Sequence, residues 1–474
     1  MDRSSGGGGL PRALALTLAS ALVWGVAHFV AGRRIAGGVL LALYLAVVAA
    51  AVAAKVYNAE AAELAVQPEM LRRLTAGLIG LGVLWMIVVV WSYLVVRPAG
   101  LTGGGHSLAA AAVVLMCVAV AVPAAFSAHR SYVARDALTS IFRTGSENGR
   151  QVDTDDPFDG QPRVNILLIG GDAAENRTGV RTDSMTVASV NTETGDTVLL
   201  SLPRNLEDVP FPPGPARDRF PYGFTGDGAG TPGLLNEVYQ YAEEHPDVVP
   251  GVAKNHRGPR LLKDTIAGVL GLRVDYYILV DMFGFADIVD ALGGVRMKVD
   301  QPIPYGLEGA VLQPGYRTLS GKEALWYGRS RTNSSDYVRM SRQKCLMRAI
   351  AEQADPKTVL TSFDKLAAAA KRTLSTDIPQ ELLPALVKLS NKVKNGAKIN
   401  SLQFVPPLIY TGNPDFDLIR KLTSDAVNTD PRQVSSHPRA SASASPSEPD
   451  GESPDRDTPK APSKPVSLDT SCPS

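Results

Sequence analysis

The sequence has little cysteine and almost no net charge. Three cysteines in 474 residues are too few for a disulfide scaffold, and they lack the spacing of metal ligands. The formal net charge of +1, from 48 Lys and Arg against 47 Asp and Glu, excludes a globally basic nucleic-acid-binding protein. There is no Gly-x-Ser-x-Gly elbow, Walker loop or zinc-ligand spacing. The usual signatures of a catalytic serine or a nucleotide site are therefore missing.

The cysteines differ in their surroundings. Cys117 lies inside an apolar segment, where a thiol serves as a small packing residue. Cys345 and Cys472 could pair outside the cytoplasm, although the composition around Cys472 predicts disorder. The sequence leaves open whether Cys345 forms a disulfide.

Long apolar runs are concentrated in residues 1–128. Four runs each approach the roughly 20 residues that a helix needs to cross a bilayer. They are Ala13–Ala31, Ile35–Ala54, Leu74–Val96 and Leu108–Ala125. The basic residues between them give no clear orientation. Because "HFVAGRRIAGG" has the composition of a re-entrant hairpin, we expect three to four transmembrane or re-entrant helices, with the first run as the one that need not cross.

Beyond residue 128 the composition changes twice. Residues 129–162 are polar and rich in turn-forming residues, which indicates a linker. Residues 163–425 have the apolar periodicity of a folded domain. Residues 426–474 are dominated by Pro, Ser, Asp and Lys and are too poor in apolar residues to fold, which predicts a disordered tail.

The folded domain alternates strand and helix patterns. Predicted strands are Val164–Ile169, Ser184–Val190, Thr197–Leu202, Tyr276–Asp281, Val295–Asp300 and Ser401–Pro406. Predicted helices are Leu234–Glu244, Pro259–Leu270, Phe283–Leu292, Tyr337–Gln353, Lys357–Thr373 and Pro379–Val393. This order predicts an α/β fold, with a mixed central sheet covered by helices on both faces.

Two acids lie where strands begin and end. Asp172 follows the first predicted strand, and Asp183 precedes the second. Ligands of open α/β sheets collect at strand ends, and two carboxylates there suit Mg²⁺. Taken alone, both acids are better explained as solvated loop or turn residues.

Arginines accompany these acids and favour a phosphate ligand. A guanidinium group matches two phosphate oxygens at once, so several arginines beside an acid pair suggest a pyrophosphate site. In a helix from Tyr337, Arg339 and Gln343 would share one face, with Asp336 one turn before. For any single arginine, a surface charge is the simpler explanation. The candidates are Arg181, Arg204, Arg329, Arg331, Arg339, Gln343 and Asp336.

The motifs in order resemble one known family. "NILLIGGD", "RTDSMTVASVN", "SLPRN", "DYYILVDMFGFADIVDALGGV" and "DYVRMSRQ" are similar to motifs of the LytR-CpsA-Psr family of cell-wall ligases, across most of Arg163–Gln353. "LLNEVYQYAEEHPD", "RQKCL" and the apolar N-terminus resemble an actinobacterial branch. The resemblance implies an α/β/α sandwich with a pocket for a polyprenyl chain, preceded by a helical membrane region.

The resemblance also implies an activity. Such an enzyme moves a glycopolymer, a teichoic acid or arabinogalactan among them, from a polyprenyl-pyrophosphate carrier to peptidoglycan outside the cell membrane, with Mg²⁺. No nucleic acid takes part. By their match to the family motifs, Asp172 and Asp183 would bind the metal and act with Arg204 in catalysis. Together with Arg204, the remaining arginines and Gln343 would bind the pyrophosphate, and Asp336 would orient Arg339.

Two departures from the family pattern keep alternatives open. Ala174 stands where many members have arginine, which leaves Arg177 as its replacement, and Asn205 follows Arg204 where many have aspartate. A pyrophosphatase that uses water as acceptor would need the same site. A non-catalytic scaffold that binds wall glycan or lipid would tolerate both departures. Neither the polymer nor a general base is predicted from the sequence.

Overall fold

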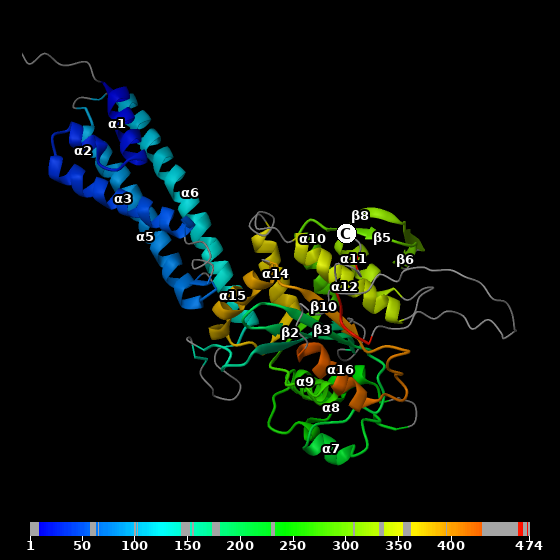
Figure 1. Ribbon diagram of the computed structural model, residues 1–474. Coiled ribbons are helices and arrows are strands. Elements are labelled where there is room, and N and C mark those ends of the chain that lie inside the picture. The colour runs from blue at the N-terminus through cyan, green and yellow to red at the C-terminus, as the bar shows by residue number, and fades with distance from the viewer. Residues whose placement is uncertain are drawn as a thin grey trace, which may run out of the picture. The chain divides into compact units, whose positions relative to one another are not determined.

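The chain forms two compact units, Met1–Thr139 and Ser140–Ser474 (Figure 1). The computed structural model describes residues 9–56, 63–64, 66–98, 101, 103–143, 152–153, 156–172, 181–228, 233–306, 309–330, 336–353, 362–394, 396–428, 463–467 and 472.

The first unit is helical. Its helices are α1 (Leu10–Leu22), α2 (Val26–Val30), α3 (Arg34–Val56), α5 (Pro68–Val96) and α6 (Gly103–Ile141). Three of them, α3, α5 and α6, are long and apolar enough to cross a membrane, whereas α1 has only 13 residues. α6 continues past residue 128, so the start of the expected linker is helical. Its sequence there, "SYVARDALTS", contains neither glycine nor proline to end the helix.

The first apolar run is not one continuous helix. The chain breaks at Gly25, whose φ of 95° lies in the left-handed region. A Cβ atom on Gly25 would lie only 2.4 Å from the carbonyl oxygen of Gly37 in α3. This close backbone contact explains why the segment from α1 to α3 turns back on itself, as the glycines and His28 suggested.

The second unit is built on a mixed sheet of seven strands, in the order β11-β10-β3-β2-β1-β4-β9. Its strands are β1 (Arg163–Asp172), β2 (Arg181–Asn191), β3 (Thr197–Leu202), β4 (Tyr276–Asp281), β9 (Leu374–Thr376), β10 (Ile399–Gln403) and β11 (Val466–Ser467). β1, β2 and β3 are consecutive antiparallel neighbours, whereas β4 runs parallel to β1 and β10 parallel to β3. The predicted mixed sheet is confirmed.

Helices cover both faces of this sheet, as Figure 1 shows. On β1, Leu167 and Ile169 face a core shared with α8 (Val238–Glu244), α9 (Arg257–Leu270) and α16 (Phe416–Asn428). Val164 and Ile166 alternate with them and pack against α15 (Leu383–Lys394). α10 (Met282–Ala291) and α14 (Phe363–Thr373) lie on the same side as α15. The period-two alternation of the strand produces the two apolar layers.

A satellite core lies beside the sheet. It joins β5 (Val295–Val299), β8 (Gly315–Leu319), α11 (Gly321–Arg329) and α12 (Asp336–Gln353). The short strands β6 (Ile303–Tyr305) and β7 (Ala310–Leu312) form a hairpin here, and α7 (Pro215–Arg219) belongs to the loop after β3. The predicted strand Val295–Asp300 exists, but it pairs with β8 in a separate two-stranded sheet.

The end of the chain is attached to the second unit. β11 pairs with β10 at the edge of the sheet, and Cys472 forms a disulfide with Cys345 of α12, with the two Cα atoms 5.3 Å apart. These contacts differ from the disordered tail expected over 426–474. Composition cannot reveal them, because an edge strand is held by backbone hydrogen bonds and a disulfide by a single distant partner.

Candidate active site

An irregularity in β2 shapes the sheet edge where the acids were predicted. Gly170 pairs with Ser184 and Gly171 with Thr182, so Asp183 is an extra residue opposite β1. Such a bulge locally disrupts the ladder and re-aims a side chain. Asp183 is therefore displaced from the regular alternation at the end of the sheet.

Two arginines from distant parts of the chain converge on Asp183. Arg204, just after β3, donates from Nη1 to the Asp183 carboxylate. Arg339, near the start of α12, donates from Nη1 to the Asp183 backbone carbonyl at 2.8 Å and is only 2% exposed. The antiparallel pairing of β2 with β3 brings Arg204 to the bulge, and the packing of α12 brings Arg339. The structure thus joins an acid and two guanidinium groups at one edge.

Three other predicted residues have contacts of a different kind. The Gln343 amide donates to the Gly328 carbonyl at 3.0 Å, which ties α12 to α11. The Arg329 guanidinium lies 5.5 Å from the centre of the Trp326 ring. Arg181, at the start of β2, is exposed and pairs through its backbone with Asp172.

Several candidates lie wholly or partly outside the described residues. Arg177 and Arg331 belong to stretches that the structure does not describe. Asp172 ends β1, and Asp336 begins α12, but only their backbone positions are described. Their predicted roles remain predictions.

Thr182 and Asn236 support the cluster, and the sequence motifs singled out neither of them. Asn236 accepts a hydrogen bond from the Thr182 hydroxyl at 3.3 Å through its carbonyl, and its backbone N–H donates to the Arg204 carbonyl at 3.0 Å. It thereby connects the strand bulge to the arginine. The Asn236 side-chain Oδ1 is buried and has no partner among the described residues. An asparagine inside the apolar stripe "LLNEVYQY" was the only available signal.

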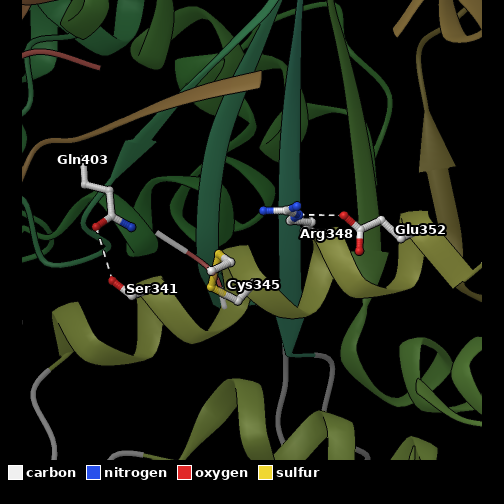
Figure 2. The surroundings of a disulfide bond; sticks show 6 residues. Ser341, Cys345, Arg348, Glu352 and Gln403 are labelled. Atoms are coloured by element: carbon white, nitrogen blue, oxygen red, sulfur yellow. Dashed lines mark hydrogen bonds and ion pairs between the residues drawn. A yellow bond between two sulfur atoms is a disulfide. The ribbon is translucent and has the colours of Figure 1, made fainter. Parts of the chain in front are cut away.

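α12 is held in place by contacts along its length. Arg342 donates to the carbonyl oxygens of Tyr327 and Ser330, at 3.3 and 2.6 Å. Burial, helped by the nearby Arg339, lowers the pKa of the Arg342 guanidinium. Figure 2 shows further contacts of α12, in which Ser341 and Cys345 project from successive turns toward Gln403 of β10 and the bonded chain end. The helix that carries Arg339 is therefore fixed on two sides.

Asn205, which departs from the family pattern, contacts a neighbouring loop. Its side-chain Nδ2 donates to the Thr411 hydroxyl at 3.3 Å, and the next residues continue the contact, since the Glu207 N–H donates to the Thr411 carbonyl at 3.0 Å. Asn205 thus connects the loop after β3 to the loop after β10. An aspartate is not needed for that role.

If Asp172 and Asp183 bind Mg²⁺, they supply only two carboxylates to it. No group of three or more His, Cys, Asp or Glu side chains gathers within the described part of the chain. Asp172 and Asp183 lie on paired strands at one edge, and Mg²⁺ commonly takes one or two carboxylates, with water and substrate phosphate completing its shell. Only the backbone position of Asp172 is described, so the magnesium site stays a prediction.

The fold and this edge define a class of protein. It is an α/β/α protein with three helices long and apolar enough to cross a membrane, and with two guanidinium groups joined to one acid at a sheet edge. The chain belongs to the LytR_cpsA_psr family, whose model matches residues 134–417.

Curated relatives give the family context. The chain is 28% identical over 254 residues to the polyisoprenyl-teichoic acid–peptidoglycan teichoic acid transferase TagU of Oceanobacillus iheyensis, covering 53% of this chain and 70% of the relative. It is 25% identical over 272 residues to TagU of Halalkalibacterium halodurans, covering 55% and 78%. Among solved structures, B. subtilis TagV aligns with a TM-score of 0.40 at 23% identity, covering 57% of this chain and 98% of that one.

Proposed function

We propose that this protein transfers a glycopolymer from a polyprenyl-pyrophosphate carrier to peptidoglycan. The observation that carries the proposal is the convergence of Arg204 and Arg339 on Asp183 at the bulged end of β2. Family membership supports it, since the relatives TagU are named as transferases between polyisoprenyl-linked teichoic acid and peptidoglycan.

The proposed reaction places few demands on protein groups. A hydroxyl oxygen of peptidoglycan forms a bond to the sugar-proximal phosphorus, while the bond from that phosphorus to the bridging oxygen breaks. Polyprenyl phosphate leaves with the electron pair, and the hydroxyl proton is released to solvent. Catalysis of such a transfer rests mainly on positioning and on neutralising the charge of the leaving phosphate. Fixed guanidinium groups supply both, which fits a chain without a serine or cysteine nucleophile signature.

The two arginines would act in different ways. Arg339 is buried and anchored to the Asp183 backbone, so it offers a preorganised positive charge beneath the phosphates. Arg204 is partly exposed and bonded to the Asp183 side chain, so a phosphate that enters from solvent would meet its guanidinium group. Asp172 and Asp183 would hold Mg²⁺, which when bound neutralises phosphate charge.

The domain is proposed to lie outside the cell membrane. If α3, α5 and α6 each cross the membrane once, the chain before α3 and the chain after α6 lie on opposite sides of the membrane. The disulfide between Cys345 and Cys472 is typical of an oxidising compartment. Both observations favour a multi-pass protein whose second unit faces the wall.

A reconstituted transfer assay tests the proposal. Full-length protein in lipid vesicles receives a polyprenyl-pyrophosphate-linked glycan, peptidoglycan and Mg²⁺, and covalent conjugate is measured. We expect conjugate formation that stops with EDTA and returns with added Mg²⁺. Cleavage of the donor without conjugate would indicate the pyrophosphatase alternative, and donor binding without cleavage would indicate a scaffold. Transfer that persists in EDTA would refute the metal assignment alone.

A further inference from the structure

A second site lies in the loops beyond the same edge of the sheet. A cavity of about 310 Å³ is lined by residues after β3 and after β10, among them Asp208, Phe211, Arg217, Tyr222, Asn413 and Phe416. β3 and β10 are parallel neighbours, so both loops leave the sheet together. Asp208 follows Arg204 by four residues, a span of at most about 14 Å even for extended chain. The cavity is therefore close to the arginine cluster, yet it is lined by different residues.

The cavity is held open by backbone contacts between its loops. The Phe224 N–H donates to the Val209 carbonyl at 3.0 Å. Gly223 has a φ of 114°, and a Cβ atom there would lie 2.4 Å from the Asp208 carbonyl oxygen, so only glycine permits this approach. Asp208 itself has a φ of 52°, which is uncommon for a non-glycine residue. These constraints preorganise the cavity wall, which lowers the cost of binding.

The lining combines aromatic rings with polar groups that have no internal role. The exposed side chains of Asp208, Arg217 and Asn413 form no hydrogen bond or ion pair with any residue that the structure describes. Tyr222 is 97% exposed, although Phe211 nearby packs against Phe220 with ring centres 5.8 Å apart. An exposed ring of this kind gains nothing from the fold. Its placement beside free polar groups suits a ligand instead.

The charges of the lining select among ligands. Asp208 and Arg217 have opposite charges, so together they add no net attraction for a phosphate chain. A hydroxyl-rich ligand suits them better, because carboxylate, amide and guanidinium groups hydrogen-bond to hydroxyls in complementary ways. The flat face of a tyrosine ring packs against the C–H face of a sugar ring. We propose that this cavity binds sugar units of a glycan that lies across the site, a proposal that rests on the proposed transfer function.

The glycan could belong to the lipid-linked donor or to the peptidoglycan acceptor, and the experiment separates the two. Full-length protein in a sugar-free zwitterionic detergent is titrated calorimetrically with a peptidoglycan tetrasaccharide. Separately, it is titrated with polyprenyl pyrophosphate that carries or lacks one N-acetylglucosamine. The variants are Tyr222→Ala and Tyr316→Ala, the second being a matched control because Tyr316 is an exposed tyrosine of β8 that does not line the cavity.

We expect Tyr222→Ala to weaken saccharide binding about tenfold or more, and Tyr316→Ala to leave it unchanged. If the loss affects the tetrasaccharide, the cavity holds the acceptor. If the wild type binds the sugar-bearing polyprenyl pyrophosphate more tightly than the sugar-free form and Tyr222→Ala does not, the cavity holds the donor glycan. Equal affinities of wild type and Tyr222→Ala for both ligands, or no saccharide binding by the wild type, would overturn the inference.

The fate of this inference is separable from that of the transferase assignment. Arg204→Ala should lose transfer but keep its affinity for the tetrasaccharide or for the sugar of the donor. Normal transfer by the wild type with no effect of Tyr222→Ala on binding removes only the glycan cavity. Normal transfer by Arg204→Ala with weakened binding by Tyr222→Ala removes only the assigned transfer site.

Discussion

Replacing Arg204 by alanine is the perturbation whose effect the structure predicts in most detail. The change removes the guanidinium group that meets the Asp183 carboxylate, but it leaves Arg339 on the Asp183 backbone. If Arg204 neutralises charge that develops on the departing phosphate, its loss should resemble the loss of one oxyanion-stabilising donor. Such losses reduce kcat by about 10²- to 10³-fold, or roughly 2.7–4 kcal/mol.

The cost in stability should be much smaller. The Arg204 and Asp183 side chains are 22% and 19% exposed, so the pair lies between a surface ion pair and a buried one. Exposed pairs contribute about 0–1 kcal/mol, whereas breaking a buried pair costs about 3–5. We therefore expect roughly 1–2 kcal/mol, equivalent to a fall in melting temperature of a few degrees in a unit of this size. Activity and stability should thus separate clearly.

The assay measures conjugate formation and thermal unfolding on the same preparations. Arg204→Lys keeps the charge without the planar fork and should recover only part of the rate. Arg372→Ala is the matched control, because Arg372 forms an exposed ion pair with Asp287 on α10 and should leave transfer unchanged. A folded Arg204→Ala protein that transfers at the wild-type rate would refute the reasoning.

Two further predictions concern stability. Lys263→Met should lower the free energy of unfolding by about 3–5 kcal/mol, because it removes the ammonium group bonded to the buried Asp377 carboxylate. That carboxylate would keep its hydrogen bond from the Tyr277 N–H but would lose the Lys263 charge. Denaturant unfolding that matches the wild type would contradict this. Cys472→Ser should lower the free energy of unfolding by about 2–5 kcal/mol. Reductant should shift the melting temperature of the wild type but not of this variant, and an equal shift in both would show that the disulfide is not responsible.

Much of the fold followed from local pattern. β3 and β4 begin and end at the predicted residues, because apolar runs flanked by turn residues define them. Two strands of the sheet did not follow, since β9 and β11 are only three and two residues long and depend on pairing with β4 and β10. Composition suggested a hairpin in "HFVAGRRIAGG", but the break at Gly25 and its close contact with Gly37 are tertiary features.

The sequence predicted which residues belong to the candidate site better than how those residues are arranged. Motif order pointed to Asp183, Arg204 and Arg339, which the structure brings together. The bulge that displaces Asp183 was not predictable, because a bulge is defined by the partner strand's register. The orientation of Gln343 toward Gly328 was likewise hidden, since four-residue spacing fixes a helix face but not the neighbour that occupies it.

Following the sugar-proximal phosphorus tests the central claim most directly. A polyprenyl-pyrophosphate-linked glycan labelled with ³²P at that position is incubated with full-length protein, peptidoglycan and Mg²⁺. The proposed transfer predicts that the label becomes covalently bound to peptidoglycan with the glycan, while unlabelled polyprenyl phosphate is released. Label recovered only on free glycan phosphate, or only on uncleaved donor, would contradict it.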